Sequence, residues 1–144
     1  MDARIPVEKA AQVFRIARES GIISSADTAV IFHDLGRIEG RIKRLQILFP
    51  ESALHALAIK ANPLVALLKR AVAAGAGMEA ASIEEVHLAL AAGCPPEKIV
   101  FDSPAKTDVE LAFALKKRIH INADSLQELK RNEELIAGGS DHGR

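Results

Sequence analysis

The stretch Ala53-Leu54-His55-Ala56-Leu57-Ala58-Ile59-Lys60-Ala61-Asn62-Pro63 decides the fold. Its first seven residues are mostly apolar and predict a buried strand, and Pro63 is typical of the start of a helix. Lys60 therefore stands where a strand ends. Because a buried ammonium is costly, such a lysine either pairs with a carboxylate or loses its proton and becomes a nucleophile that condenses with aldehydes. Position alone leaves a second interpretation open, in which the side chain packs its stem on the strand and reaches water.

The same pattern of strand, polar corner and amphipathic helix occurs four times from residue 53 onward. The predicted strands are residues 53–59, 76–81, 98–101 and 119–122. Three of the helix starts carry a Ser/Thr-x-x-Glu capping pattern, namely Ser82 with Glu85, Thr107 with Glu110, and Ser125 with Glu128. Strands that alternate with helices through short corners require parallel pairing and right-handed crossovers, so we predict an α/β fold.

Two α/β architectures fit this repeat, an open doubly wound sheet and a (β/α)8 barrel. No G-x-G-x-x-G or G-x-x-x-x-G-K-[ST] motif follows a predicted strand, which favours the barrel. A closed TIM-type barrel needs about 250 residues, so parallel βα repeats in a 144-residue chain make roughly half of one. We expect either a piece of a longer barrel or a half barrel that associates with another copy.

The predicted organisation has four parts. Residues 1–27 form a helix and linker, and residues 28–52 form a lead-in strand at 28–32 and an amphipathic helix capped by Asp34. Residues 53–137 hold the four βα units of an incomplete barrel. Residues 138–144 are rich in glycine and polar residues and are expected to be a flexible tail.

Composition excludes several classes of function. Nineteen basic and nineteen acidic residues are interspersed, so binding to nucleic acid or anionic lipid is not expected. Neither a membrane span nor a signal-peptide core is recognisable, and a cytoplasmic location is the expectation. The lone Cys94 is interpreted as a small apolar filler rather than a catalytic thiol, and the histidines lack metal-ligand spacing.

Polar residues at the carboxyl ends of the strands are the candidates for a site, because active sites of parallel α/β folds form there. They are Lys60, Asn62, Glu79, Asp102, Ser103, Asn122 and Asp124. Structural alternatives exist for most of them: Asn62, Asp124 and Ser125 can cap helices, and Asp102 can start a turn. Glu79 interrupts a small apolar strand and is either a site carboxylate or a structural partner of a Lys or Arg. His33 could border a site, although a structural histidine is the more frequent case.

Several of these stretches together resemble the start of the fold-type III pyridoxal-phosphate decarboxylases, a group that includes diaminopimelate, ornithine and arginine decarboxylases. The similar stretches lie between residues 28 and 137: Ala58-Ile59-Lys60-Ala61-Asn62, Gly75-Ala76-Gly77-Met78-Glu79-Ala80-Ala81-Ser82 with Glu85, Ala91-Ala92-Gly93-Cys94-Pro95-Pro96-Glu97-Lys98-Ile99-Val100-Phe101, Ala105-Lys106-Thr107, and Ile121-Asn122-Ala123-Asp124-Ser125 with Glu128-Leu129.

The resemblance implies that Lys60 is the catalytic lysine and carries pyridoxal 5'-phosphate as a Schiff base, with Glu79 and Asn62 close to the cofactor. It also implies an amino-acid substrate and a homodimer in the full-length form. Two residues depart from the family pattern: Glu79 stands where an aspartate is usual, and Leu57 replaces a common aromatic. The family's ring-stacking histidine, glycine-rich phosphate loop, pyridine-nitrogen carboxylate and C-terminal β domain have no counterpart before Arg144, so this chain alone is expected to be inactive.

Two alternatives are kept. One is a racemase-like or non-catalytic barrel that binds the same cofactor, although racemases similar to this family continue the lysine motif with Tyr-Gly-His where this chain has Pro63-Leu64-Val65. The other is a remnant without activity that associates with itself through an exposed strand edge and apolar face.

Overall fold

The computed structural model describes residues 5–139, which belong to two compact units that divide between His33 and Asp34. In the first unit, helix α1 (Val7–Glu19) confirms the predicted N-terminal helix and ends at Ser20, before Gly21 with its positive φ of 70°. The lead-in strand predicted at residues 28–32 is wrong. Residues 28–32 form no strand, and the strands of the described chain pair only with one another.

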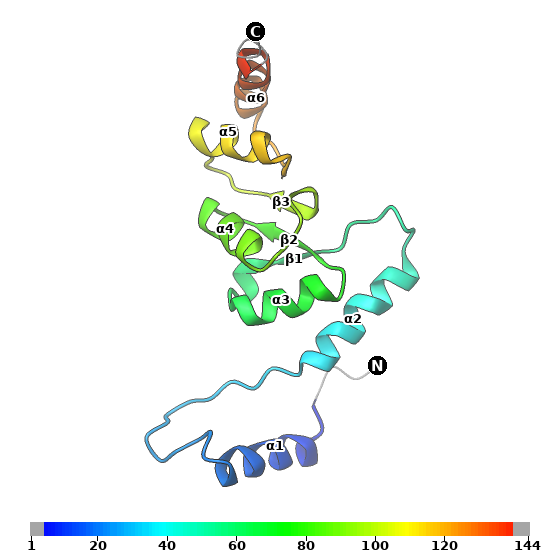
Figure 1. Cartoon of the computed structure of the whole chain (residues 1–144), viewed down its shortest axis with the longest axis vertical. Helices are drawn as coiled ribbons and strands as arrows, with labels where there is room; N and C mark the ends of the chain where they lie inside the picture. The colour runs from blue at the N-terminus through cyan, green and yellow to red at the C-terminus, as the bar shows by residue number, and fades with distance from the viewer. Residues whose placement is uncertain (1–4, 140–144) are drawn as a thin grey trace. The chain divides into compact units, whose positions relative to one another are not determined.

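The second unit is built on a parallel sheet, which confirms the predicted α/β class (Figure 1). Its strands are β1 (Ala56–Ala58), β2 (Gly77–Ala80), β3 (Ile99–Phe101) and β4 (His120–Ile121), in the order β1-β2-β3-β4. Each adjacent pair is parallel. The strands are shorter than the predicted ranges, and Lys60 lies in a single 3-10 turn, η1 (Ile59–Ala61), just after β1.

Helices connect the strands as the repeat predicted. They are α3 (Val65–Ala73), α4 (Ile83–Ala91) and α5 (Asp108–Lys117), and a second 3-10 turn, η2 (Pro96–Lys98), precedes β3. Helix α2 (Leu35–Leu48) precedes the sheet, and α6 (Leu126–Gly139) follows it. Figure 1 shows α3, α4 and α5 lying beside the sheet, one after another in chain order. Helix α6 continues to Gly139, so the predicted tail begins too early, and residues 140–144 lie outside the described chain.

The core lies between the sheet and these helices. Strand residues Met78, Ile99 and Phe101 are fully buried and belong to one cluster with Leu68 of α3 and Val86 of α4. Cys94 is also buried in this cluster, as expected of a small apolar filler. The opposite strand positions form a row through Ala58, Glu79, Val100 and His120, which are in register across the sheet. That face therefore carries small and polar side chains as well as Val100.

The helix that precedes the sheet is amphipathic only in part. Asp34 caps α2 by accepting from the backbone N–H of Arg37, as predicted. Ile42 is buried and Ile38 packs on the core, whereas Leu35, Leu45 and Phe49 are 36 to 52% exposed.

The three capping patterns have three different outcomes. Thr107 and Glu110 form the complete reciprocal box. Ser82 accepts from the N–H of Glu85, but the Glu85 carboxylate accepts from the N–H of Ala81 instead of that of Ser82. Ser125 accepts from the N–H of Glu128, whose carboxylate is engaged elsewhere.

Two glycines let the chain enter β2. Gly75 ends α3 with a φ of 94°, and a Cβ on Gly77 would collide with the backbone carbonyl of Lys98 beside it. Among residues 5–139, no helix has both the length and the hydropathy that crossing a bilayer requires.

Candidate functional site

The carboxyl ends of β1 and β2 bring two predicted site residues together. Lys60 comes from the turn after β1, and Glu79 lies near the end of β2, in register with Ala58 of β1. The Nζ atom of Lys60 is 3.8 Å from Oε1 of Glu79. The sheet therefore pairs the candidate amine with the carboxylate whose role the sequence left open.

The two members of this pair differ in exposure. The Lys60 side chain is 64% exposed, whereas that of Glu79 is 17% exposed. The amine of Lys60 is therefore not desolvated in this chain, which matches the interpretation in which the side chain reaches water. It is instead the carboxylate that is buried: Oε1 of Glu79 is inaccessible and has no hydrogen-bond partner among the described residues.

Asn62 has a local structural role. Its Oδ1 atom accepts from the backbone N–H of Leu64 at 3.2 Å, just before α3. This bond matches the capping alternative.

The remaining candidates lie after β3 and β4. Asp102, Asn122 and Asp124 are exposed, and Ser103 is buried with its hydroxyl accepting from the N–H of Ala105. Thus the structure brings together Lys60 and Glu79, and it places the other polar residues on the next two strand ends.

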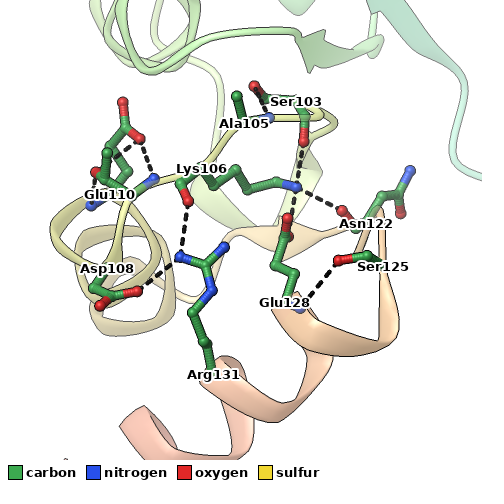
Figure 2. A network of polar contacts seen from close by, with 10 residues as sticks. Ser103, Ala105, Lys106, Asp108, Glu110, Asn122, Ser125, Glu128 and Arg131 are labelled. Atoms are coloured by element: carbon green, nitrogen blue, oxygen red, sulfur yellow. Dashed lines mark hydrogen bonds and ion pairs between the residues drawn. The ribbon is translucent and has the colours of Figure 1, made fainter.

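Sequence reasoning missed the most buried charges at this edge. Lys106 and Glu128 form an ion pair of 2.6 Å, with side chains 0% and 3% exposed (Figure 2). The Lys106 amine also donates to the carbonyl oxygens of Ser103 and Asn122. Glu128 is predicted as a capping residue and as part of a family-like stretch, and no local pattern reveals a partner that lies 22 residues away.

A hollow of about 830 Å³ lies elsewhere on the second unit. His120, Val100 and Asn122 line it, together with the chain before β1, and Nε2 of His120 lies 2.9 Å from the carbonyl oxygen of Glu97. Lys60 and Glu79 do not line this hollow. In residues 5–139, no three His, Cys, Asp or Glu side chains are grouped to hold a metal ion. The candidate site is therefore defined by the paired charges at the carboxyl edge.

This pair suits carbonyl chemistry. An accessible lysine amine can attack an aldehyde once it has lost its proton. The unpartnered oxygen of Glu79 would also accept a hydrogen bond from a bound molecule.

Comparisons with known proteins identify relatives of this chain. Diaminopimelate decarboxylase of Deinococcus radiodurans is 34% identical over 102 residues, which cover 71% of this chain and 27% of the relative. The Aquifex aeolicus enzyme of the same name is 40% identical over 99 residues, covering 68% and 23%. The crystal structure of the Helicobacter pylori diaminopimelate decarboxylase with L-lysine superposes with a TM-score of 0.75 at 26% identity, covering 91% of this chain and 32% of that one.

The chain thus spans about a quarter of the length of these curated relatives. The similarity to decarboxylases whose N-terminal domains are TIM barrels confirms that its four strands are part of such a barrel. Residues 35–140 match the pyridoxal-binding domain of the pyridoxal-dependent decarboxylases. The chain therefore belongs to the fold-type III pyridoxal-phosphate decarboxylase family, whose cofactor is pyridoxal 5'-phosphate.

Proposed function

We propose that this chain supplies the cofactor-binding part of a pyridoxal-phosphate-dependent amino-acid decarboxylase and that Lys60 is the residue that forms the Schiff base. The observation that carries the proposal is the pair of Lys60 and Glu79 at the carboxyl edge of the sheet. Of the lysines in the described chain, Lys60 combines an accessible amine, a strand-end position and a carboxylate within 4 Å.

The residues at this edge fit the cofactor. Lys60 presents a side chain that an aldehyde in solution can reach, and it is held at the end of β1 by the turn η1. Glu79 contributes a fixed negative charge and a buried oxygen in need of a donor. Bound pyridoxal phosphate supplies the electron-accepting ring that decarboxylation requires. Glu79 would place its carboxylate beside the nitrogen of Lys60.

The substrate is proposed to be an amino acid. The relatives named above are diaminopimelate decarboxylases, and the Helicobacter pylori structure holds L-lysine. An amino acid with a second amine in its side chain is the class that these relatives favour. We further propose that the full-length form is a homodimer and acts in the cytoplasm.

The 144-residue chain by itself is proposed to lack decarboxylase activity. The Lys60 side chain is mostly exposed, so water would surround the reacting atoms. Decarboxylases of this kind depend on an enclosed site that excludes water and fixes the substrate. Binding of the cofactor alone makes no such demand and is the property to measure.

The test is a titration of the chain with pyridoxal phosphate, followed by the absorbance of the Schiff base. Lys60→Ala should weaken saturable binding at least tenfold. Lys69→Ala, which removes an exposed lysine of α3, is the matched control and should bind as the unaltered chain does. Equal binding by the Lys60→Ala chain would exclude Lys60 as the cofactor lysine.

A further inference from the structure

A buried charge network stands at the same edge of the sheet and has no role in the function proposed above. Its centre is the Lys106 amine, which lies 2.6 Å from Oε1 of Glu128, 2.6 Å from the Ser103 carbonyl oxygen and 2.8 Å from the Asn122 carbonyl oxygen. A lysine ammonium has three protons, so all of them have acceptors here. The amine also lies 5.6 Å from the ring centroid of the buried Phe101.

Stability alone does not explain this pair. Removing two charges from water is costly, and a buried ion pair replaced by apolar residues of similar volume is often as stable or more stable. What an apolar pair cannot reproduce is the directional bonding of the amine. The two backbone carbonyls that Lys106 binds would lose their donor.

Those carbonyls belong to two different strand ends. Ser103 lies in the loop between β3 and α5, and Asn122 follows β4 directly. The loops carry the exposed side chains of Asp102 and Asn122. Figure 2 shows the Lys106 amine between the two loops, with Glu128 reaching it from the first turn of α6. One side chain therefore joins two adjacent loops of the carboxyl edge.

A second contact holds the same region. Nη1 of Arg131, on α6, donates to the carbonyl oxygen of Lys106 at 3.1 Å and to Oδ1 of Asp108 at 2.8 Å. Lys106 itself belongs to the loop between β3 and α5, and Arg131 of α6 binds its backbone carbonyl. Its amine ties this loop to Asn122 in the loop after β4.

We propose that Lys106 is a positioning residue, whose amine fixes the loops after β3 and β4 relative to each other so that the carboxyl edge has one preformed shape for the cofactor held at Lys60. The ligand in this inference, pyridoxal phosphate, rests on the proposed function, whereas the geometry of the two loops does not depend on it. Glu128 accepts from the amine and holds it in place, and Lys106 acts through the loops rather than by contact with the cofactor.

The test separates loop order from stability with two variants. In Lys106→Met/Glu128→Leu, the charges are removed together, so the free energy of unfolding should stay near that of the unaltered chain. Its amides in residues 102–105 and 122–124 should exchange with deuterium about tenfold faster, and pyridoxal phosphate should bind about tenfold more weakly. In Glu128→Gln, the amine keeps its backbone acceptors, so the chain should be less stable, yet its loops and its cofactor binding should stay within about threefold of the unaltered values.

The matched control is Glu39→Leu/Arg70→Met, which removes an ion pair of the same 2.6 Å length whose members are 27% and 56% exposed. It should leave loop exchange and cofactor binding unchanged. Loop exchange rates that follow overall stability through the series would overturn the proposal, as would unchanged exchange in the double variant. If the unaltered chain fails to bind the cofactor at Lys60, the proposed function fails, and the exchange series still decides whether Lys106 orders the loops.

Discussion

Nζ of Lys60 lies 3.8 Å from Oε1 of Glu79, and this pair joins a side chain that is 64% exposed to one that is 17% exposed. The distance exceeds that of a hydrogen bond, so the buried oxygen of Glu79 is left without a donor. Unpaired polar atoms in a protein interior are uncommon and cost stability. The unpaired oxygen of Glu79 therefore lowers the stability of the fold, and a bound molecule that donates a hydrogen bond to it would offset this loss.

Replacement of Glu79 by Met should separate stability from binding. The substitution removes an unpartnered buried oxygen and keeps an unbranched side chain beside Ala58 and Val100. We therefore expect the free energy of unfolding to rise by up to about 1 kcal/mol. Cofactor affinity should fall several-fold. Urea unfolding and pyridoxal phosphate titration measure the two effects, with Glu133→Met, at an exposed residue of α6, as a surface control. A loss of stability above about 1 kcal/mol would show that the carboxylate is structural.

Phe101 should be the side chain on which the core depends most. It is fully buried on β3 and is the largest such side chain described. Phe101→Ala should cost about 3–5 kcal/mol in the free energy of unfolding, because it leaves a cavity between the sheet and its helices. Val109→Ala, at a residue that is 80% exposed, should change stability by less than about 0.5 kcal/mol. Similar values for the two variants in urea unfolding would contradict the described core.

The capping box at the start of α5 should make a measurable contribution to the stability of the chain. Thr107 accepts from the N–H of Glu110, and Oε2 of Glu110 accepts from the N–H of Thr107 at 2.6 Å. Thr107→Ala should cost about 1 kcal/mol, whereas Thr107→Ser keeps the hydroxyl and should cost only a few tenths. Thermal unfolding followed by circular dichroism can rank the two. An equal loss for both would mean that the methyl group, and not the cap, is responsible.

Alkaline pH should destabilise the chain through Cys94. Burial raises the pKa of this thiol above its ordinary value. Above the pKa of the unfolded chain, about 8.5, the unfolded state loses the thiol proton while the folded state retains it, so stability falls as pH rises. Cys94→Ala should remove this part of the decline between about pH 8.5 and 10. Parallel pH profiles of the two chains in urea unfolding would show that the thiol makes no such contribution.

The sequence predicted elements that depend on local periodicity and capping. The parallel strands, the connecting helices and the cap at Asp34 are all found. The strand at residues 28–32 failed for a physical reason: an apolar run becomes a strand only beside a pairing partner, and local sequence does not supply one.

The candidate site was predictable in part for the same reason. Lys60 and Glu79 follow from strand ends that the repeat places side by side. The exposure of Lys60 depends on which residues cover the carboxyl edge of the sheet. The Lys106–Glu128 pair depends on a contact between residues that are far apart in the sequence. No spacing pattern in the sequence indicates either of these two features. Glu128 shows the difficulty most clearly, since its position after Ser125 predicts a cap while its carboxylate binds Lys106.

The most direct test of the central claim is the location of the cofactor on the chain. The protein is loaded with a limiting amount of pyridoxal phosphate, reduced with borohydride so that the linkage becomes permanent, digested, and mapped by mass spectrometry. The account predicts that the pyridoxyl group is found predominantly on Lys60, and that Glu79→Met lowers its yield there. A label spread over exposed lysines such as Lys69 and Lys116, or concentrated on any residue other than Lys60, would contradict it.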